Sequence, residues 1–210
     1  MSPRIYKASQ QTKNNILQKA IEIFNQSGTA SISMNALAEA VGMSAGNLQY
    51  HFKNKEEVIR AIMEEMFKQF DVIYQPTDQP FTLETLRRMM RLNFEIIWSY
   101  PFFFRELGAL LRNDKLLARR FREIQEQRLA DQEKIIKGLA GTGGNRTALN
   151  PDELHNVVFT GWVLGHTLLP YIESMGQKIN EAALEQAVEI MVQHYKPYLY
   201  RFLFYSNKEN

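Results

Sequence analysis

The sequence predicts an all-α protein in which an N-terminal three-helix head precedes a six-helix body. Apolar residues recur at the three- and four-residue spacing of amphipathic helices along most of the chain, and the alternating pattern of strands is absent. Ser, Thr and Asn residues precede the periodic segments, and Gly and Pro residues interrupt them, as the caps and ends of helices do. The 210 residues are enough to bury a substantial core.

The head contains three short helices within residues 9–52. Ser9, Ser33 and Ser44 precede these helices, and each hydroxyl is predicted to accept a hydrogen bond at a helix N-terminus. Gly28 is predicted to end the first helix, and Gly42 to form the turn between the second and the third. Residues 1–54 are therefore expected to form one domain.

The remaining residues, 55–210, are expected to form a ligand-binding and dimerisation domain of six longer helices. These helices are predicted over residues 55–74, 82–99, 101–111, 114–139, 151–175 and 180–205. The stretch from Asn150 to Glu153 has an N-cap, a Pro at the first helical position and an acid three residues after the cap. Pro197 is expected to kink or restart the last helix.

Charge and composition restrict the class of protein. Residues 1–55 carry six Lys and Arg side chains against two acids, whereas the whole chain has a net charge of +2, so the head favours a polyanionic partner. The chain has no Cys, which excludes disulfides and thiolate metal sites and fits a reducing cytoplasm. Neither a membrane-spanning apolar run nor the apolar stretch of a signal peptide is present, so a cytoplasmic protein is expected.

Two helices joined by a tight turn, over about residues 33–52, have the spacing of a helix-turn-helix, which places its second helix in the major groove of DNA. If Leu48 and Phe52 are buried, the polar residues between them face outward, where Asn and Gln side chains can pair with adenine edges. The second helix of this unit contains no Lys or Arg, and Lys53 and Lys55 follow directly after it. The residues predicted to contact DNA are Ser33, Ser44, Ala45, Gly46, Asn47, Gln49, Tyr50, His51, Lys53 and Lys55.

The stretch "NALAEAVGMSAGNLQYHFKNKEEVI" resembles the DNA-binding head of the tetracycline-repressor (TetR) family of bacterial regulators. The matching residues are Leu37, Ala38, Gly42, Met43, Ser44, Leu48, His51, Phe52 and Lys55. Two positions depart from the pattern. Ile32 stands where Thr or Ser is common, and Gln49 stands where the family usually has a phosphate-contacting Tyr. Gln49 is therefore either a base reader or a lost phosphate contact.

The resemblance implies a homodimer that binds a palindromic operator and a body that binds a small-molecule inducer. The helices over residues 151–175 and 180–205 resemble the pair that forms the dimer interface in this family. Gly161 and Gly165, four residues apart, permit close helix packing, either within one subunit or across the dimer.

An apolar or amphipathic ligand is expected in the body, where large aromatic and Met side chains gather. The residues predicted to line its pocket are Phe94, Trp98, Phe104, Trp162 and His166. Arg91, Arg105, Glu106 and His166 are candidate polar contacts for the ligand. Aromatic residues at helical spacing also form ordinary cores, and this alternative stays open.

No catalytic residue, metal ligand or cofactor motif is predicted. "GTGGNR" lacks the preceding strand and the following Lys and Ser or Thr of a phosphate-binding loop, and the His residues lack zinc-site spacing. The sequence therefore predicts a sequence-specific DNA-binding regulator of transcription that acts as a repressor and is released by a small ligand. The alternative is a helical small-molecule-binding protein or enzyme whose DNA-binding head is vestigial.

Overall fold

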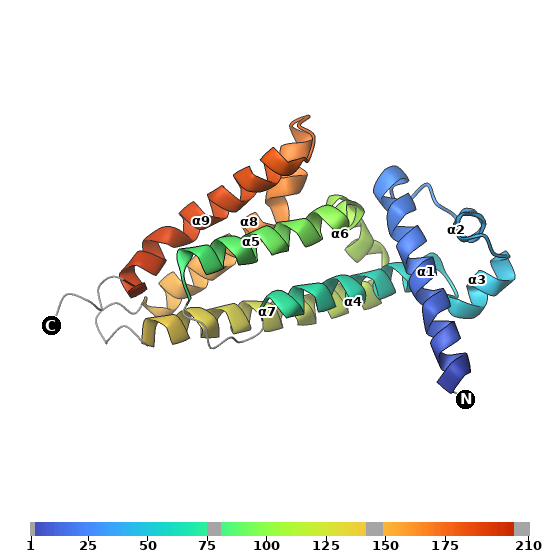
Figure 1. The fold of residues 1–210 in the computed structure, drawn as a ribbon, viewed down its shortest axis with the longest axis horizontal. Helices are drawn as coiled ribbons and strands as arrows, with labels where there is room; N and C mark the ends of the chain where they lie inside the picture. Colours follow the sequence, from blue (N-terminus) through green and yellow to red (C-terminus); the bar gives the residue numbers. More distant parts are fainter. Residues whose placement is uncertain (1–2, 75–80, 142–148, 204–210) are drawn as a thin grey trace. The chain divides into compact units, whose positions relative to one another are not determined.

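The computed structural model describes residues 3–74, 81–141 and 149–203, and these residues form nine α-helices and no strand (Figure 1). The helices are α1 (Pro3–Ser27), α2 (Met34–Val41), α3 (Ala45–His51), α4 (Lys55–Ile73), α5 (Leu83–Ser99), α6 (Pro101–Asn113), α7 (Lys115–Gly141), α8 (Pro151–Ser174) and α9 (Glu181–Leu203). The predicted all-α class, with three helices at the N-terminus and six after them, is confirmed. None of the helices in the described ranges is both long enough and apolar enough to cross a membrane.

The chain divides into two compact units. The first unit comprises Met1–Asp71 and Tyr100–Leu117, and the second comprises Val72–Ser99 and Ala118–Asn210. The first unit thus holds α6 and most of α4 in addition to the three head helices, and the second holds α5, α8, α9 and most of α7. The predicted functional division after residue 54 stays a prediction.

The core of the first unit forms where α1 packs against α2 and α6. Ile16 and Phe24 on the inner face of α1 are fully buried, and the Phe24 ring lies 5.3 Å from the Phe102 ring of α6 between centroids. Arg60 of α4 forms an ion pair with Asp114, which is buried directly after α6. Burial of these apolar faces supplies the main driving force that holds the short helices.

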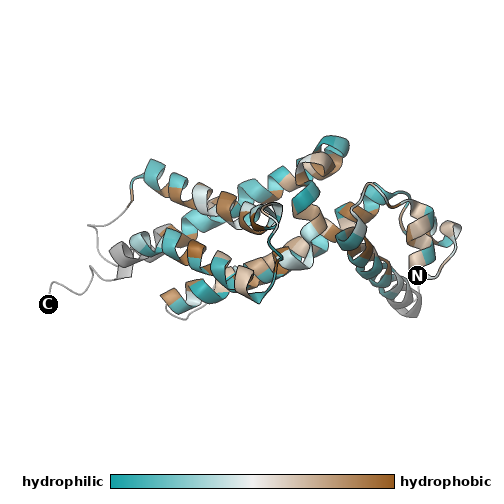
Figure 2. Cartoon of the chain, turned by 90° about the horizontal axis from the view of Figure 1, so that it is seen from above, coloured by the Kyte–Doolittle hydropathy of each residue, from teal (hydrophilic) through white to brown (hydrophobic). Residues whose placement is uncertain are grey.

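In the second unit α5 packs against α8 and α9, and α8 packs against α9. Phe94 of α5 and Leu184 of α9 are fully buried in this unit. On its surface Arg87 of α5 pairs with Glu185 and Glu189 of α9, at 3.0 and 2.5 Å. Figure 2 shows hydrophilic and hydrophobic residues on the same helices, as amphipathic helices around a core require.

Most predicted helix ends are confirmed, and two differ. Gly28 and Gly42 end α1 and α2 with φ of 73° and 75°, in the left-handed region that glycine adopts at low cost. The first helix begins at Pro3, so Ser9 lies inside it and is not its cap, because Pro is well suited to the first turn of a helix. The helix α9 continues through Pro197 to Leu203 without restarting. Residues 142–148, which include most of the stretch "GTGGNR", lie outside the described residues.

Candidate nucleic-acid interface and cavities

The turn between α2 and α3 has the geometry of a helix-turn-helix. The Ser33 hydroxyl accepts a hydrogen bond from the Ala36 N–H at 3.1 Å and caps α2. At the other end of α2, the N–H groups of Gly42 and Met43 donate to carbonyl oxygens of the last turn, which forms a Schellman motif. The Ser44 hydroxyl then caps α3 through the backbone N–H three residues later, at 3.2 Å. Both predicted caps are confirmed.

The outer face of α3 carries the predicted reading residues. Leu48 is fully buried, and Gly46, Asn47, Gln49 and Tyr50 are exposed. The side chain of Tyr50 is 76% exposed, which is unusual for a large aromatic residue. The remaining residues of the predicted interface, Ser33 and Ser44, are exposed, and Ala45 is half-buried. The face therefore offers amides, a phenol and a bare backbone to a partner.

His51 and Lys53 lie at the C-terminal end of α3. The His51 ring is half-buried and packs edge-on against the Tyr50 ring, with centroids 5.2 Å apart. Its Nδ1 atom is buried and has no hydrogen-bond partner within the described ranges. Lys53 is exposed. A polar nitrogen left without a partner has a free-energy cost that a bound group or a water molecule can remove.

Lys55 has a structural contact that the sequence reasoning missed. Its ammonium group donates hydrogen bonds to the carbonyl oxygens of Thr29 and Ile32, at 2.6 and 2.9 Å. The same loop is held from its other side by Glu106 of α6. The Glu106 carboxylate accepts from the Thr29 N–H at 3.0 and 3.2 Å and from the Thr29 hydroxyl at 2.5 Å. A Cβ on Gly28 would lie 2.7 Å from this carboxylate, so both its φ and its surroundings favour glycine there.

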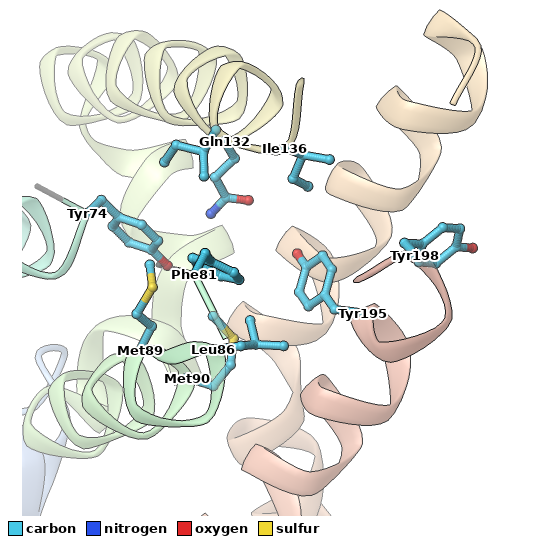
Figure 3. Close-up of a pocket in the computed structure, with 10 residues that line it drawn as sticks. Tyr74, Phe81, Leu86, Met89, Met90, Gln132, Ile136, Tyr195 and Tyr198 are labelled. Atoms are coloured by element: carbon cyan, nitrogen blue, oxygen red, sulfur yellow. The ribbon is translucent and has the colours of Figure 1, made fainter. Parts of the chain in front are cut away.

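Two cavities lie within the second unit. The larger encloses about 560 Å³, including its open mouth, and the smaller about 260 Å³. The larger is lined by Tyr74, Phe81, Leu86, Met89, Met90, Gln132, Ile135, Ile136, Tyr195 and Tyr198 (Figure 3). The smaller is lined by Tyr74, Met90, Asn93, Gln132, Gly161, Trp162, Gly165, His166, Met191 and Tyr195. The larger cavity is lined mainly by apolar and aromatic side chains with few polar groups, as ligand-binding pockets are.

Two of the five predicted ligand-binding residues, Trp162 and His166, line the smaller cavity. Phe94, Trp98 and Phe104 line neither cavity. Phe94 is fully buried in the core, Trp98 is 42% exposed on the surface, and Phe104 belongs to the first unit. Helical spacing could place each aromatic residue on a face, but it could not tell which faces meet around a cavity.

Most of the residues predicted to make polar contacts with the ligand also lie away from the two cavities. Arg91 is engaged in ion pairs with Glu95 and Glu181, and Arg105 donates to the Asn25 carbonyl at 3.2 Å. Only His166 lines a cavity. Tyr74, Gln132 and Tyr195, which line both, were missed, because nothing in their local pattern distinguishes them from core residues.

Burial controls the ionisation of the cavity residues. It raises the pKa of the Tyr74 phenol to about 12, against the smaller opposing effect of the Arg128 charge. Burial likewise raises the pKa of Tyr195 and lowers the pKa of His166, and the Arg128 charge lowers the His166 pKa further. All three groups are therefore uncharged near neutral pH. His166 Nδ1 lies 2.7 Å from the Trp162 carbonyl oxygen, which requires the proton on Nδ1 in the neutral ring.

The two glycines of α8 pack within the chain. A Cβ on Gly161 would overlap the Tyr195 hydroxyl of α9, and one on Gly165 would lie 3.9 Å from Asn93 and 4.0 Å from Met191. Gly161 thus provides the space that the Tyr195 ring occupies. Of the two alternatives left open by the sequence, the structure gives Gly161 a packing role inside one subunit, whereas a side chain at Gly165 would make only ordinary contacts.

Comparison with known families identifies the chain. The profile described as "Bacterial regulatory proteins, tetR family" matches residues 16–62, and the profile described as "Bacterial transcriptional repressor" matches residues 63–202. The helix-turn-helix defines the class, a DNA-binding regulator of transcription. The two matches together cover most of the sequence, and the chain therefore belongs to the TetR family of bacterial regulators.

Individual relatives agree with this assignment. The AcrR regulator of Shigella flexneri is 33% identical over 64 residues, a match that spans 30% of each chain. The YttP regulator of Bacillus subtilis is 22% identical over 196 residues, which span 92% of this chain and 88% of that protein.

Solved structures share the fold. The crystal structure of a TetR-family regulator from Marinobacter aquaeolei VT8 superimposes with a TM-score of 0.78, at 30% identity over 89% of this chain and 90% of that one. A structure of AibR, in complex with isovaleryl coenzyme A and operator DNA, gives a TM-score of 0.63 at 20% identity over 86% and 96% of the two chains. At 20% identity, the similarity to AibR shows a shared fold alone.

Proposed function

We propose that the chain is a repressor that binds a palindromic operator as a homodimer and is released from it by a small apolar or amphipathic ligand. The observation that carries this proposal is the outer face of α3. It exposes Asn47, Gln49 and Tyr50 on a helix that Ser44 caps and Leu48 anchors in the core. A vestigial head, as in the alternative, would have no reason to keep both caps and an exposed phenol.

The residues of this face divide into two roles. Asn47 and Gln49 read base edges in the major groove, because an amide can donate and accept at an adenine edge simultaneously. Tyr50 and Lys53 contact phosphates and sugars and fix the position of the helix. His51 is placed with them because its half-buried ring packs against the exposed Tyr50 ring at the C-terminal end of α3. The full proposed interface is Ser33, Ser44, Ala45, Gly46, Asn47, Gln49, Tyr50, His51, Lys53 and Lys55.

A homodimer is supported by apolar residues on the surface of α8 and α9. Phe159, Val163, Tyr171 and Met175 follow one another at multiples of four residues, and each is at least 43% exposed. Ile190 of α9 is also exposed. Residues four apart are neighbours on a helix, and each step of four turns by about 40° around its axis. Phe159 and Val163 therefore form one apolar patch on α8, and Tyr171 and Met175 form another at its C-terminal end, and a second copy of the chain would cover these patches. Two copies would present two α3 helices to successive major grooves about 34–36 Å apart.

The cavities of the second unit are the proposed site of the ligand. AibR, which shares this fold, forms a complex with isovaleryl coenzyme A and operator DNA, and this supports a ligand-responsive mechanism here. Tyr74 lines both cavities and directly follows Ile73, the last residue of α4. A ligand that displaces Tyr74 can therefore act through α4 on the spacing of the two heads. It releases the operator only if it binds more tightly to the conformation that does not bind DNA.

The proposed DNA partner also indicates in which compartment of the cell the protein works. A regulator of transcription works where the chromosome lies, so we place it in the bacterial cytoplasm. No membrane partner is proposed.

Fluorescence anisotropy with labelled DNA from upstream of the protein's own gene tests DNA binding. We expect tighter binding to this DNA than to a shuffled duplex, and an observed association constant that falls steeply with salt, with a logarithmic slope of about −0.9 per neutralised phosphate. Sedimentation with and without the duplex reports the number of chains bound. Equal and salt-independent affinity for both duplexes would refute the proposed function.

A further inference from the structure

The two cavities of the second unit are direct neighbours. Tyr74, Met90, Gln132 and Tyr195 line both of them, so we treat the two spaces together as one combined site. The larger cavity contributes aliphatic and aromatic side chains and the thioether of Met89. The smaller adds groups that form hydrogen bonds: an amide from Asn93, an indole from Trp162 and an imidazole from His166. The combined site therefore has an apolar end and a polar end.

Polar groups converge where the two parts meet. Figure 3 shows the hydroxyls of Tyr74 and Tyr195 and the amide of Gln132 directed into the same space, from the turn after α4, from α9 and from α7. Tyr195 is only 9% exposed, and its hydroxyl has no hydrogen-bond partner among the residues that the structure describes. The Tyr74 hydroxyl, by contrast, donates to Asn93 Oδ1 at 3.3 Å. A hydroxyl that faces a cavity without an internal partner can donate a hydrogen bond to an oxygen atom of a ligand.

The charges around the site exclude one class of ligand. Among the described residues that line the two cavities there is no Asp, Glu, Lys or Arg. Arg128 is a buried positive charge near the site that acts on both Tyr74 and His166, and it also interacts with the Asp131 carboxylate. An ammonium group would lose its hydration there, meet no carboxylate and be repelled by Arg128. The site thus disfavours cations.

We infer that the combined cavity selects single-chain amphiphiles whose polar end is an uncharged or anionic oxygen acceptor. The chain lies along the larger cavity beside Met89, and the acceptor oxygen takes hydrogen bonds from Tyr195 and Gln132. This inference rests on the ligand-responsive function proposed above and narrows its ligand class. Gly161 makes the arrangement possible, since any side chain there would displace the Tyr195 hydroxyl.

The intrinsic fluorescence of the protein reports binding at this site. The chain contains two Trp residues, of which Trp162 lines the smaller cavity and Trp98 lies 42% exposed on the surface. In a Trp98→Phe variant all indole emission comes from Trp162. The probes are alkyl carboxylates, primary alcohols and alkyltrimethylammonium ions of equal chain length, from hexyl to dodecyl, each used below its micelle concentration.

We expect carboxylates and alcohols to bind about fourfold more tightly for each added methylene until the cavity is full. The ammonium ions should bind at least about tenfold more weakly than carboxylates of the same length, because their desolvation is uncompensated. Ammonium binding as tight as carboxylate binding, or no binding by any probe, would overturn the inference.

Two variants locate the ends of the ligand. Tyr195→Phe removes the hydroxyl and should weaken the binding of carboxylates and alcohols roughly two- to tenfold. The fold should persist, since no internal hydrogen bond is lost. Met89→Leu, which changes only the larger cavity, should alter the dependence on chain length and leave the preference among polar ends unchanged. Equal affinity of all probes for the Tyr195→Phe variant and the parent would contradict the assigned acceptor position.

DNA affinity, measured separately, keeps the two proposals distinguishable. Selective binding of carboxylates that leaves the affinity for upstream DNA unchanged refutes ligand-controlled repression and preserves the ligand class. Normal DNA binding together with equal affinity for all three polar ends refutes the ligand class and preserves the regulator.

Discussion

Replacement of Lys55 by Met tests whether this residue positions the head or simply contacts DNA. Met keeps the unbranched stem and removes the ammonium group, which donates to the carbonyl oxygens of Thr29 and Ile32. A hydrogen bond from a charged group contributes about 1.5–3 kcal/mol. Because the ammonium group is only partly buried, water recovers part of this value, and we expect the two bonds together to contribute roughly 2–3 kcal/mol.

This loss should be visible in thermal unfolding. A chain of about this length shifts its midpoint by about 2–4 °C for each kcal/mol, so Lys55→Met should lower Tm by roughly 4–12 °C. Circular dichroism of the free protein measures the midpoint, and anisotropy with upstream DNA measures the affinity. The loop that precedes α2 would lose its anchor on α4, so DNA affinity should fall on every sequence.

Lys53→Met is the matched control. Lys53 lies two residues earlier, is exposed, and its ammonium group forms no hydrogen bond in the described part of the chain. Its replacement should leave Tm unchanged and reduce the salt slope of DNA binding by about 0.9, the contribution of one phosphate contact. If both variants retained the parent Tm and lost DNA affinity equally, Lys55 would be a phosphate contact alone and the reasoning would be refuted.

Gln49→Ala should change the preference among bases at one operator position by about 1–3 kcal/mol and leave the salt dependence of DNA binding unchanged. Binding to operators that differ at single base pairs measures this preference. If the preference stays the same, Gln49 does not read a base and stands where the family's phosphate contact has been lost. Gly161→Ala should cost about 1–3 kcal/mol in denaturant unfolding, because its Cβ overlaps the Tyr195 hydroxyl, whereas Gly165→Ala should be neutral or stabilising. Burial lowers the pKa of His166 in the folded state, so the unfolded chain binds more protons once pH falls below about 6.5. The free energy of unfolding should therefore decrease as pH drops through that range, and His166→Gln should flatten this dependence in urea titrations at several pH values.

Helix boundaries were largely predictable because the signals that set them are local. Ser33, Ser44 and Asn54 each accept a hydrogen bond from the backbone N–H three residues later, and this spacing can be read directly from the sequence. The same holds for the capping box that Asn150 and Glu153 form at the start of α8. Only the first helix started earlier than expected, since Ser9 is as compatible with a helix interior as with a cap.

Contacts between distant segments were not predictable. Lys55 and Thr29 are separated by 26 positions, and Glu106 and Thr29 by 77. No periodic pattern connects them, so sequence reasoning assigns Lys55 to phosphate and Glu106 to a ligand. Cavity-lining residues are equally hard to predict from the sequence. Phe104 and Trp162 both read as large aromatics on an apolar face, yet packing places Phe104 in the core of the first unit and Trp162 beside a cavity of the second.

The proposed DNA-binding face and the proposed ligand site are connected through α4. The helix α4 begins at Lys55, which holds the loop before α2, and its last residue, Ile73, is followed directly by Tyr74, which lines both cavities. A ligand that leaves Tyr74 where it is has no differential affinity through this route and cannot shift the equilibrium, however tightly it binds. Under the proposed mechanism, tight binding and release of DNA are therefore separable properties, and the ligand that controls the regulator is expected to be one that moves Tyr74.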